Sequence, residues 1–319
     1  MSAQVMPQAK KTVGLMGCSY YLPPSITVDE LAQATGMSAT LRSMYVENHG
    51  LRRVHIAGEE SALDMTEQAV RRLLEKHNLH PLDVDTVILY HTLNFLSLEP
   101  KTFVSAVQRK LGLEHAVAFS VAGQHCASPV TALRVARNML LAGSARNVLL
   151  VGCDFFVGSL QREIHGISLQ GEGASCAILQ NHCATNQIIA ISTYVDGSLY
   201  KGTAAAEDEF DKFDLIYYFA CYQLIRNTLK KAALAMDDIR LIIPHNINRP
   251  SWHKILSTLK CGEDRLFADN IERCGHVCSA DLMINLSDAI EAGRLQKGDY
   301  FMLFTVGLGA VWACAILQH

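Results

Sequence analysis

The 319-residue sequence predicts an α/β protein that contains two copies of one helix-and-strand unit. Two pairs of similar segments support this prediction: residues 69–90 resemble residues 224–245, and residues 126–143 resemble residues 276–293. In addition, patterns typical of strands and helices alternate along the whole chain, which implies sheets covered by helices. We therefore expect a layered α/β sandwich that is formed twice, with one shared site on the axis between its copies.

The first copy contains short apolar runs rich in branched and aromatic residues, which are typical of buried strands. These runs predict strands over residues 12–21, 86–90, 116–122 and 147–151. Helices are expected over residues 61–76 and 127–141, where apolar residues recur at helical spacing and capping residues stand at the ends. Cys126 thus lies between a strand and the start of a helix.

The second copy repeats this order. Its strands are expected over residues 188–195, 241–244, 300–306 and 310–317, and its helices over residues 217–233, 253–259 and 279–292. The acidic stretch 207–214 is interpreted as a solvated connection rather than a lid over a pocket. His245 ends a strand, and the second segment pair places His276 where the first copy has Cys126.

The composition excludes several classes of protein. Half of the residues are hydrophobic and only 18% are charged, which is typical of a compact globular chain. No run reaches the roughly 18 apolar residues of a membrane helix, and the N-terminus lacks the apolar core of a secretory signal. A net charge of −3 offers no basic surface for nucleic acid. We expect a cytoplasmic protein with neither nucleic acid nor membrane as a partner.

The ten cysteines contain no CxxC pair, so a zinc ribbon or a thioredoxin-type site is not expected. Cys274, His276 and Cys278 stand close together in the sequence and could contribute to a metal site. However, no second pair of ligands lies nearby in the chain, and we therefore expect no metal.

Three residues suggest covalent chemistry. The thiol of Cys126 would face the positive end of a helix, which lowers a thiol pKa and favours the nucleophilic thiolate. His245 and His276 would stand at element ends near it. Each also has an ordinary structural interpretation: a buried thiol for Cys126, a core or surface histidine for His245, and a helix cap for His276.

Five motifs together carry a resemblance to a known family. They are AGQHCAS at 122–128, GEGAS at 171–175, PHNINR at 244–249, GH at 275–276 and GLGAVW at 307–312. In order and spacing they resemble the thiolase superfamily and, within it, the ketoacyl synthase III branch. The resemblance implies a thiolase fold, an αβαβα sandwich whose halves span residues 1–182 and 183–319. It also implies an obligate homodimer, a ping-pong reaction on acyl thioesters, and no cofactor beyond the substrate.

The resemblance assigns roles to the three candidate residues. Cys126 would carry the acyl group, and His245 would hold the carbonyl of the second thioester. The family usually has an asparagine where this chain has His276, so the set becomes Cys-His-His. Decarboxylative condensation with a malonyl-type thioester is the leading expectation. Alternatively, His276 could be the base for an oxygen, nitrogen or sulfur acceptor, or the chain could be the silent partner of a heterodimer.

The same resemblance implies the residues that shape the site. The backbone N–H groups of Cys126 and Leu308 would form the oxyanion hole, with Gly307 and Gly309 on either side of Leu308. The family has glycine in place of Leu308, so the leucine side chain must find room. Asn248 would support the catalytic histidine, although its alternative interpretation is a turn residue.

The donor is expected to be an acyl carrier protein, with acyl-CoA as the alternative. Starter enzymes that use acyl-CoA hold its adenine with a tryptophan and an arginine, and this chain has Met44 and Asn48 there. Arg249 and Lys254 could form a basic rim for an acidic carrier protein. The segment 94–102, with Phe95, Leu96 and Leu98, would lie at the dimer contact and limit the acyl chain.

Overall fold

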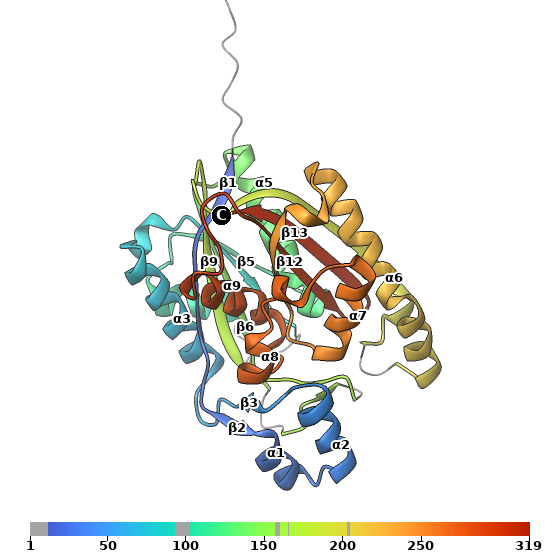
Figure 1. Ribbon diagram of the computed structural model, residues 1–319. Helices are drawn as coiled ribbons and strands as arrows, with labels where there is room; N and C mark the ends of the chain where they lie inside the picture. Colours follow the sequence, from blue (N-terminus) through green and yellow to red (C-terminus); the bar gives the residue numbers. More distant parts are fainter. Residues whose placement is uncertain (1–11, 93–102, 157–159, 165, 203–204) are drawn as a thin grey trace, which may run out of the picture.

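The computed structural model describes residues 12–92, 103–156, 160–164, 166–202 and 205–319. Its central feature is a nine-stranded sheet with the order β11-β12-β13-β10-β1-β9-β6-β4-β5 (Figure 1). The strands are β1 (Val13–Tyr21), β4 (Thr86–Tyr90), β5 (Val117–Val121), β6 (Asn147–Asp154), β9 (Gly173–Asn181), β10 (Gln187–Val195), β11 (Ile239–Pro244), β12 (Tyr300–Gly307) and β13 (Val311–Gln318).

The sheet consists of two strand sets with the same order, which confirms the duplication. In the first set β1, β9 and β6 are antiparallel neighbours, and β6, β4 and β5 are parallel neighbours. In the second set β10, β13 and β12 are antiparallel, and β12 and β11 are parallel. A parallel bridge between Ile242 and Leu266 stands where the first set has β5. The sets join through Gly14 and Gln187, and the proposed division at residues 182 and 183 falls in the loop between β9 and β10.

The helices complete five layers, as the sequence predicts. Helices α5 (Ser128–Ala142) and α9 (Asp281–Glu291) share one buried apolar cluster with strands of both sets. Helices α3 (Ala62–Lys76) and α4 (Phe103–Leu111) cover the outer face of the first set. Helices α6 (Glu207–Ala232) and α7 (Arg249–Leu259) cover that of the second. Figure 1 shows α3 and α6 on opposite sides of the molecule.

Short elements gather at one end, at the bottom of Figure 1. They are α1 (Val28–Thr35), α2 (Ala39–Ser43), the pair β2 (Ser25–Thr27) and β3 (Arg53–His55), and the pair β7 (Glu163–Ile164) and β8 (Ser168–Leu169). A π-helical turn, η1, spans Met44–Asn48. Helix α8 (Asp269–Cys274) also lies near this end.

The sequence did not predict helices α1, α2, α4 and α8. Two further features of the secondary structure differ from the expectation. Residues 207–214 are the first two turns of α6 and not a connection, because Glu209 caps the helix by accepting the N–H of Ala206 at 2.8 Å. Phe213 and Tyr217 of α6 are buried, so this acidic stretch has an apolar side. Strand β9 was not among the expected strands, since glycine, alanine and serine at its start have low strand propensity. Its burial between β1 and β6 outweighs that propensity.

The two halves are related by a different shift from the one expected around Cys126. Helices α5 and α9 begin at Ser128 and Asp281, a shift of 153 positions (281 − 128). Each follows a 3₁₀ turn whose first residue has a positive φ, 48° at His125 and 50° at Cys278. Ser279, and not His276, therefore occupies the position equivalent to Cys126, and the expected match was wrong by three positions.

Candidate active site

A cavity of about 500 Å³ brings the three candidate residues together. Cys126 reaches it from the 3₁₀ turn η3 (His125–Ala127), His245 from the end of β11, and His276 from the loop before the 3₁₀ turn η8 (Cys278–Ala280). Side chains of α6 form part of its wall: Phe213, Tyr217 and Tyr218. The expected grouping of Cys126, His245 and His276 around one cavity is thus present.

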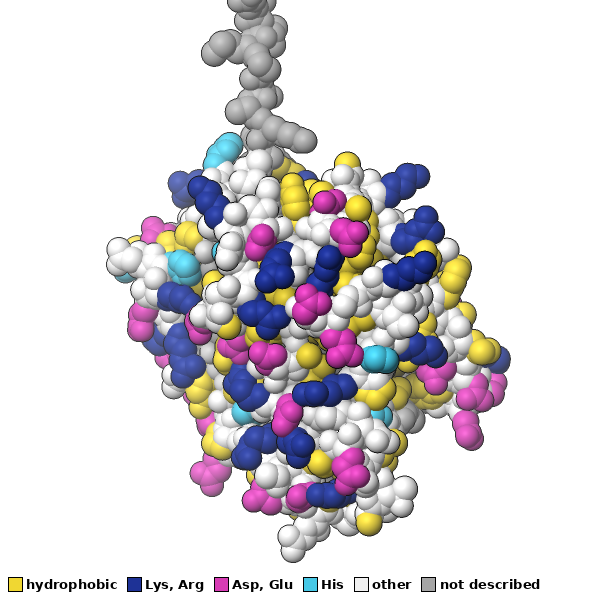
Figure 2. Space-filling model, viewed as in Figure 1, with side chains coloured by type: hydrophobic (Ala, Val, Ile, Leu, Met, Phe, Trp, Pro, Cys, Tyr) yellow, Lys and Arg dark blue, Asp and Glu magenta, His cyan; other side chains and the backbone are white. Residues whose placement is uncertain are grey.

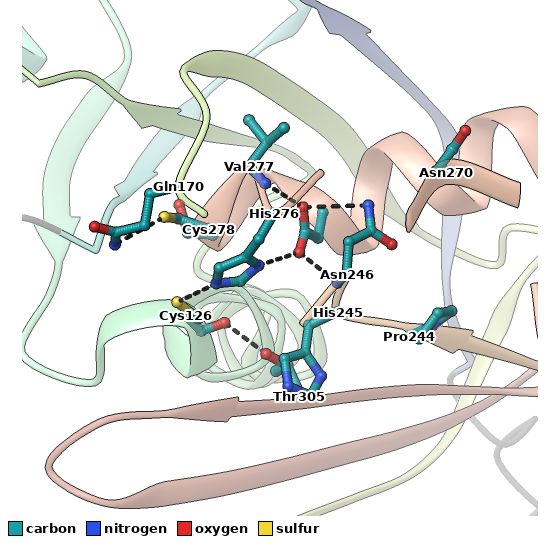
Figure 3. Close-up of polar contacts among 12 residues, drawn as sticks. Cys126, Gln170, Pro244, His245, Asn246, Asn270, His276, Val277, Cys278 and Thr305 are labelled. Atoms are coloured by element: carbon teal, nitrogen blue, oxygen red, sulfur yellow. Dashed lines mark hydrogen bonds and ion pairs between the residues drawn. The ribbon is translucent and has the colours of Figure 1, made fainter. Parts of the chain in front are cut away.

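The thiol of Cys126 is buried and lies 3.3 Å from Nε2 of His276 (Figure 3). The hydroxyl of Thr92 donates to the same sulfur at 3.7 Å. A hydrogen bond from Cys278 lowers the pKa of the Cys126 thiol; burial opposes this, and the charge of His276 reinforces it. The net pKa lies well below the usual thiol value. This shift favours the thiolate form of Cys126, which is the form that a nucleophile requires.

His276 lies between Cys126 and a buried carboxylate. Its Nδ1 is 2.6 Å from Oδ2 of Asp281, the first residue of α9. Burial by itself would lower the pKa of His276, but the charges of Asp281 and Cys126 outweigh it and raise the pKa well above its usual value. Because the carboxylate accepts the Nδ1 hydrogen, Nε2 is the nitrogen that exchanges a proton with the sulfur.

Sequence reasoning missed Asp281, which two backbone groups also hold in place. Oδ1 accepts the N–H of Val277 at 2.7 Å, and Oδ2 accepts the N–H of Asn246 at 2.6 Å. The available signal was an acidic residue near the start of a predicted helix, five positions after His276. That signal alone is also typical of an ordinary helix cap.

His245 differs from His276 because neither of its ring nitrogens bonds to any described residue. The ring is buried, and its centre is 6.1 Å from that of His276. Burial, and then the charge of His276, lowers the pKa of His245 to about 3, so this imidazole is neutral. An unpaired buried polar group is unfavourable by about 1–3 kcal/mol, and it is available to a substrate atom in the cavity.

A second buried carboxylate fixes the two turns relative to each other. Asp154, at the end of β6, accepts the N–H of Thr92 at 2.8 Å and the N–H of Ser279 at 2.7 Å. It therefore joins the residue that contacts the Cys126 sulfur to the turn η8. The sequence offered no pattern that marks Asp154 as part of the site.

The residues expected to shape the site lie at the same cavity. Leu308 is in the turn between β12 and β13 and lines the cavity; its role in an oxyanion hole with Cys126 stays a prediction. A Cβ at Gly307 would lie 2.1 Å from the carbonyl oxygen of Gln124, so this position requires glycine. Gly309 has a φ of 131°, which also favours glycine.

Asn248 has the local structural role that the sequence left open, and its support of His245 stays a prediction. As the N-cap of α7 it accepts the N–H of Ser251 at 2.7 Å. Its Nδ2 also donates to the carbonyl of Ile167 at 3.0 Å, and both residues line the cavity. Asn248 therefore connects the start of α7 to the segment between β7 and β8.

Both residues of the expected basic rim already contact other side chains of the protein. Arg249 forms an ion pair with Glu272 at 3.1 Å, and Arg52 binds the same carboxylate at 2.8 Å. Lys254 lines the cavity, and its Nζ lies 3.9 Å from the ring centre of Tyr218. Figure 2 shows acidic and basic side chains interspersed over the visible face. The docking role of Arg249 and Lys254 stays a prediction.

Two further expectations concern membranes and the acyl pocket. The described part of the chain contains no helix that is long and apolar enough to cross a membrane. Phe95, Leu96 and Leu98, which the resemblance places at the dimer contact, lie outside the described residues.

The thiolase-type architecture and a thiol paired with a buried imidazole define an enzyme of acyl condensation or transfer. Models of 3-oxoacyl-[acyl-carrier-protein] synthase III match residues 122–197, and models of the C-terminal part of that enzyme match residues 229–319. A β-ketoacyl-[acyl-carrier-protein] synthase III of Roseiflexus castenholzii is 30% identical over 293 residues, covering 84% of this chain and 87% of that protein. The Aquifex aeolicus protein of the same name is 25% identical over 315 residues, covering 96% and 99%.

Solved structures show the same fold. The Aquifex aeolicus synthase III superimposes with a TM-score of 0.85 at 23% identity, covering 96% of this chain and 100% of that chain. ChlB3, described as an acyltransferase, also gives 0.85, at 19% identity, covering 96% and 97%. The chain belongs to the 3-oxoacyl-[acyl-carrier-protein] synthase III family of the thiolase superfamily.

Proposed function

We propose that this enzyme moves an acyl group from a carrier-protein thioester to Cys126, and from there to an oxygen, nitrogen or sulfur acceptor without decarboxylation. One observation carries the proposal: Nδ1 of His276 lies 2.6 Å from the carboxylate of Asp281. This contact gives His276 the hydrogen-bond arrangement of a general base that faces the nucleophile.

The first half of the reaction begins with the Cys126 thiolate, while Nε2 of His276 holds the proton. The sulfur attacks the carbonyl carbon of the incoming thioester, and the N–H groups of Cys126 and Leu308 stabilise the oxyanion. The bond to the carrier sulfur then breaks. The departing thiolate takes the proton from His276, which leaves an acyl-Cys126 and a neutral imidazole.

The second half uses the same nitrogen in the reverse sense. Nε2 of His276 removes the proton of the acceptor as the acceptor attacks the acyl carbon, and Asp281 stabilises the imidazolium that forms. The bond between the acyl carbon and Cys126 breaks, and the thiolate–imidazolium pair returns. His245 is neutral and bonds to no described residue, and one of its nitrogens can donate a hydrogen bond to a substrate oxygen.

The sequence favours decarboxylative condensation, but the arrangement of His276 supports transfer better. Decarboxylation of a malonyl thioester needs donors that converge on the enolate oxygen. In the acyl-enzyme the departing thiolate has taken the Nε2 proton, so His276, with its hydrogen on Nδ1, presents a lone pair at Nε2 and cannot donate there. Only His245 would remain as a side-chain donor. Condensation is therefore the second candidate, and it requires a protonated His276.

The remaining parts of the proposal follow from the resemblance to the family. The acyl donor is a carrier protein, with acyl-CoA as the alternative, the active form is a homodimer, and no cofactor takes part. The silent-partner alternative is not retained, because a nucleophile and its base lie within contact distance.

Radiolabelled acyl thioesters test the proposal. Wild-type protein should acquire label at Cys126 from acyl carrier protein, whereas Cys126→Ala should not. The label should then leave with a panel of small alcohols, amines and thiols, and malonyl carrier protein should release no CO₂. Release of CO₂ together with a ketoacyl product would establish condensation instead, and absence of label on wild type would contradict both candidates.

A further inference from the structure

A second thiol lies beside the nucleophile and is neither acylated nor used as a base in the proposed reaction. Cys278 is the first residue of η8, and its backbone has a φ of 50°, a conformation that residues other than glycine rarely adopt. Its side chain is buried, and Nε2 of Gln170 donates to its sulfur at 3.4 Å. The thiols of Cys126 and Cys278 and a ring nitrogen of His276 all lie within 4.8 Å of one another (Figure 3).

This spacing fits a tetrahedral metal ion. Zinc binds cysteine sulfur at about 2.3 Å and histidine nitrogen at about 2.0–2.1 Å, so neighbouring ligand atoms around it are about 3.5–3.8 Å apart. The sulfur of Cys126 and Nε2 of His276 are 3.3 Å apart. Small side-chain rotations would therefore place all three ligands around one ion.

The surroundings of His276 are also those of a metal ligand. A histidine that binds zinc usually donates its other ring N–H to a carboxylate, which orients the ring and makes it a better ligand. Asp281 accepts this bond from Nδ1, and its position is fixed by the N–H groups of Val277 and Asn246. Because Cys126 and His276 line the cavity, a fourth ligand could reach the ion from there.

We propose that Cys126, His276 and Cys278 bind a thiophilic divalent cation, zinc above all, and that its binding stops acyl transfer. Two thiolates and one imidazole favour zinc over magnesium or calcium, which prefer oxygen ligands. Binding releases the Nε2 proton of His276 and the thiol proton of Cys278 to solvent, and it occupies the sulfur that would attack the thioester. The cation is thus a reversible inhibitor and not a cofactor of the reaction.

The sequence led to the opposite expectation because it showed only the three neighbours Cys274, His276 and Cys278. In the fold, Cys274 packs in a small apolar cluster that includes Val277 and Ile284, and the distant Cys126 completes the site. Cys274 therefore provides a matched control. It is a buried cysteine of the same segment that lies outside the proposed site.

Cobalt titration of reduced, chelator-treated protein tests the proposal without relying on activity. One equivalent of Co²⁺ should produce the absorption bands of tetrahedral cobalt with thiolate ligands, and Zn²⁺ should abolish them. Cys278→Ala should weaken binding about 100-fold or more, and Asp281→Asn about 10–100-fold. Cys274→Ala should bind as wild type, and protein alkylated at Cys126 should show no bands.

Acyl transfer by wild-type protein should fall in proportion to zinc occupancy and recover when chelator is added. Thermal unfolding of each variant establishes that it is folded, and Cys278→Ser provides a second variant should alanine destabilise the turn. Absence of the cobalt bands in folded wild-type protein would overturn the proposal. Unchanged binding in folded Cys278→Ala or Cys278→Ser protein would also overturn it.

Discussion

Replacing Asp281 by asparagine tests the feature that separates transfer from condensation. The carboxylate accepts hydrogen bonds from Nδ1 of His276 at 2.6 Å, from the N–H of Asn246 at 2.6 Å and from the N–H of Val277 at 2.7 Å, and a longer one from Nδ2 of Asn246 at 3.5 Å. A neutral amide has one acceptor oxygen, so at least one of these donors would face the NH₂ group of the new asparagine side chain and lose its hydrogen bond. One buried donor left unpaired lowers the free energy of unfolding by about 1–3 kcal/mol.

The effect on transfer should exceed the effect on stability. Without the carboxylate, His276 no longer has a charge that favours its protonated form or a partner that keeps the hydrogen on Nδ1. Since general acid–base catalysis contributes about 10²–10⁴-fold, we expect Asp281→Asn to slow transfer from acyl-Cys126 by a factor in that range.

The assay separates the two half-reactions. Rapid-quench measurement with labelled acyl carrier protein follows the gain of label at Cys126, and addition of the acceptor follows its loss. Asp288→Asn is the control, because this carboxylate also belongs to α9 but bonds to Tyr20 and Asn270, outside the site. Transfer by Asp281→Asn within about threefold of wild type would refute the role of His276 as an Asp281-supported base.

Three further predictions concern neighbouring residues. In chelator-treated protein, alkylation of Cys126 by iodoacetamide should stay fast as the pH falls below about 8.5, the usual thiol pKa, because the Cys126 pKa is lowered. Cys278→Ala should move the fall in rate to higher pH, and a wild-type rate that already falls near pH 8.5 would contradict the shift. Gly307→Ala should destabilise the protein by about 1–3 kcal/mol in thermal unfolding, since the Cβ meets the Gln124 carbonyl at 2.1 Å. Gly197→Ala is its control, because the added Cβ meets no atom of the described residues within 4 Å, and equal melting temperatures would be inconsistent with the clash. His245→Ala should accept label at Cys126 but slow its transfer, and an unchanged transfer rate would exclude His245 from the second half-reaction.

The fold could be predicted because its signals are local and occur twice. The strand over residues 86–90 and the helix over residues 61–76 agree with β4 and α3 to within one residue at each end. Strand β9 escaped prediction because its small residues become a strand only through pairing with β1 and β6. The start of α6 was not predicted because a run of acidic residues is typical of a solvent-exposed connection. At a helix N-terminus, however, acidic residues also stabilise the helix.

The site was predictable only where one position carried a strong chemical signal. Cys126, His245 and His276 stand at the ends of recognisable elements, and the cavity brings them together. The partners that decide what these residues do are ordinary acidic and sulfur-containing residues. Asp154 and Cys278 take part through contacts between segments more than a hundred positions apart. Asp281 contacts His276 across the turn η8, whose backbone conformation no spacing rule predicts.

The duplication explains why neither half would form this site alone. Strands β6 and β12 end at Asp154 and Gly307, which are equivalent at the shift of 153 that relates α5 and α9. Asp154 of the first half holds the backbone of Ser279 in the second half, at the position equivalent to Cys126. In the reverse direction, Thr305 of β12 donates to the carbonyl of Cys126 at 2.9 Å. Gly307 has no side chain that would clash with the carbonyl of Gln124, just before the turn that carries Cys126. Each half therefore supports the turn of the other. Because the halves differ at these equivalent positions, the nucleophile belongs to one half, and the base with its carboxylate belongs to the other.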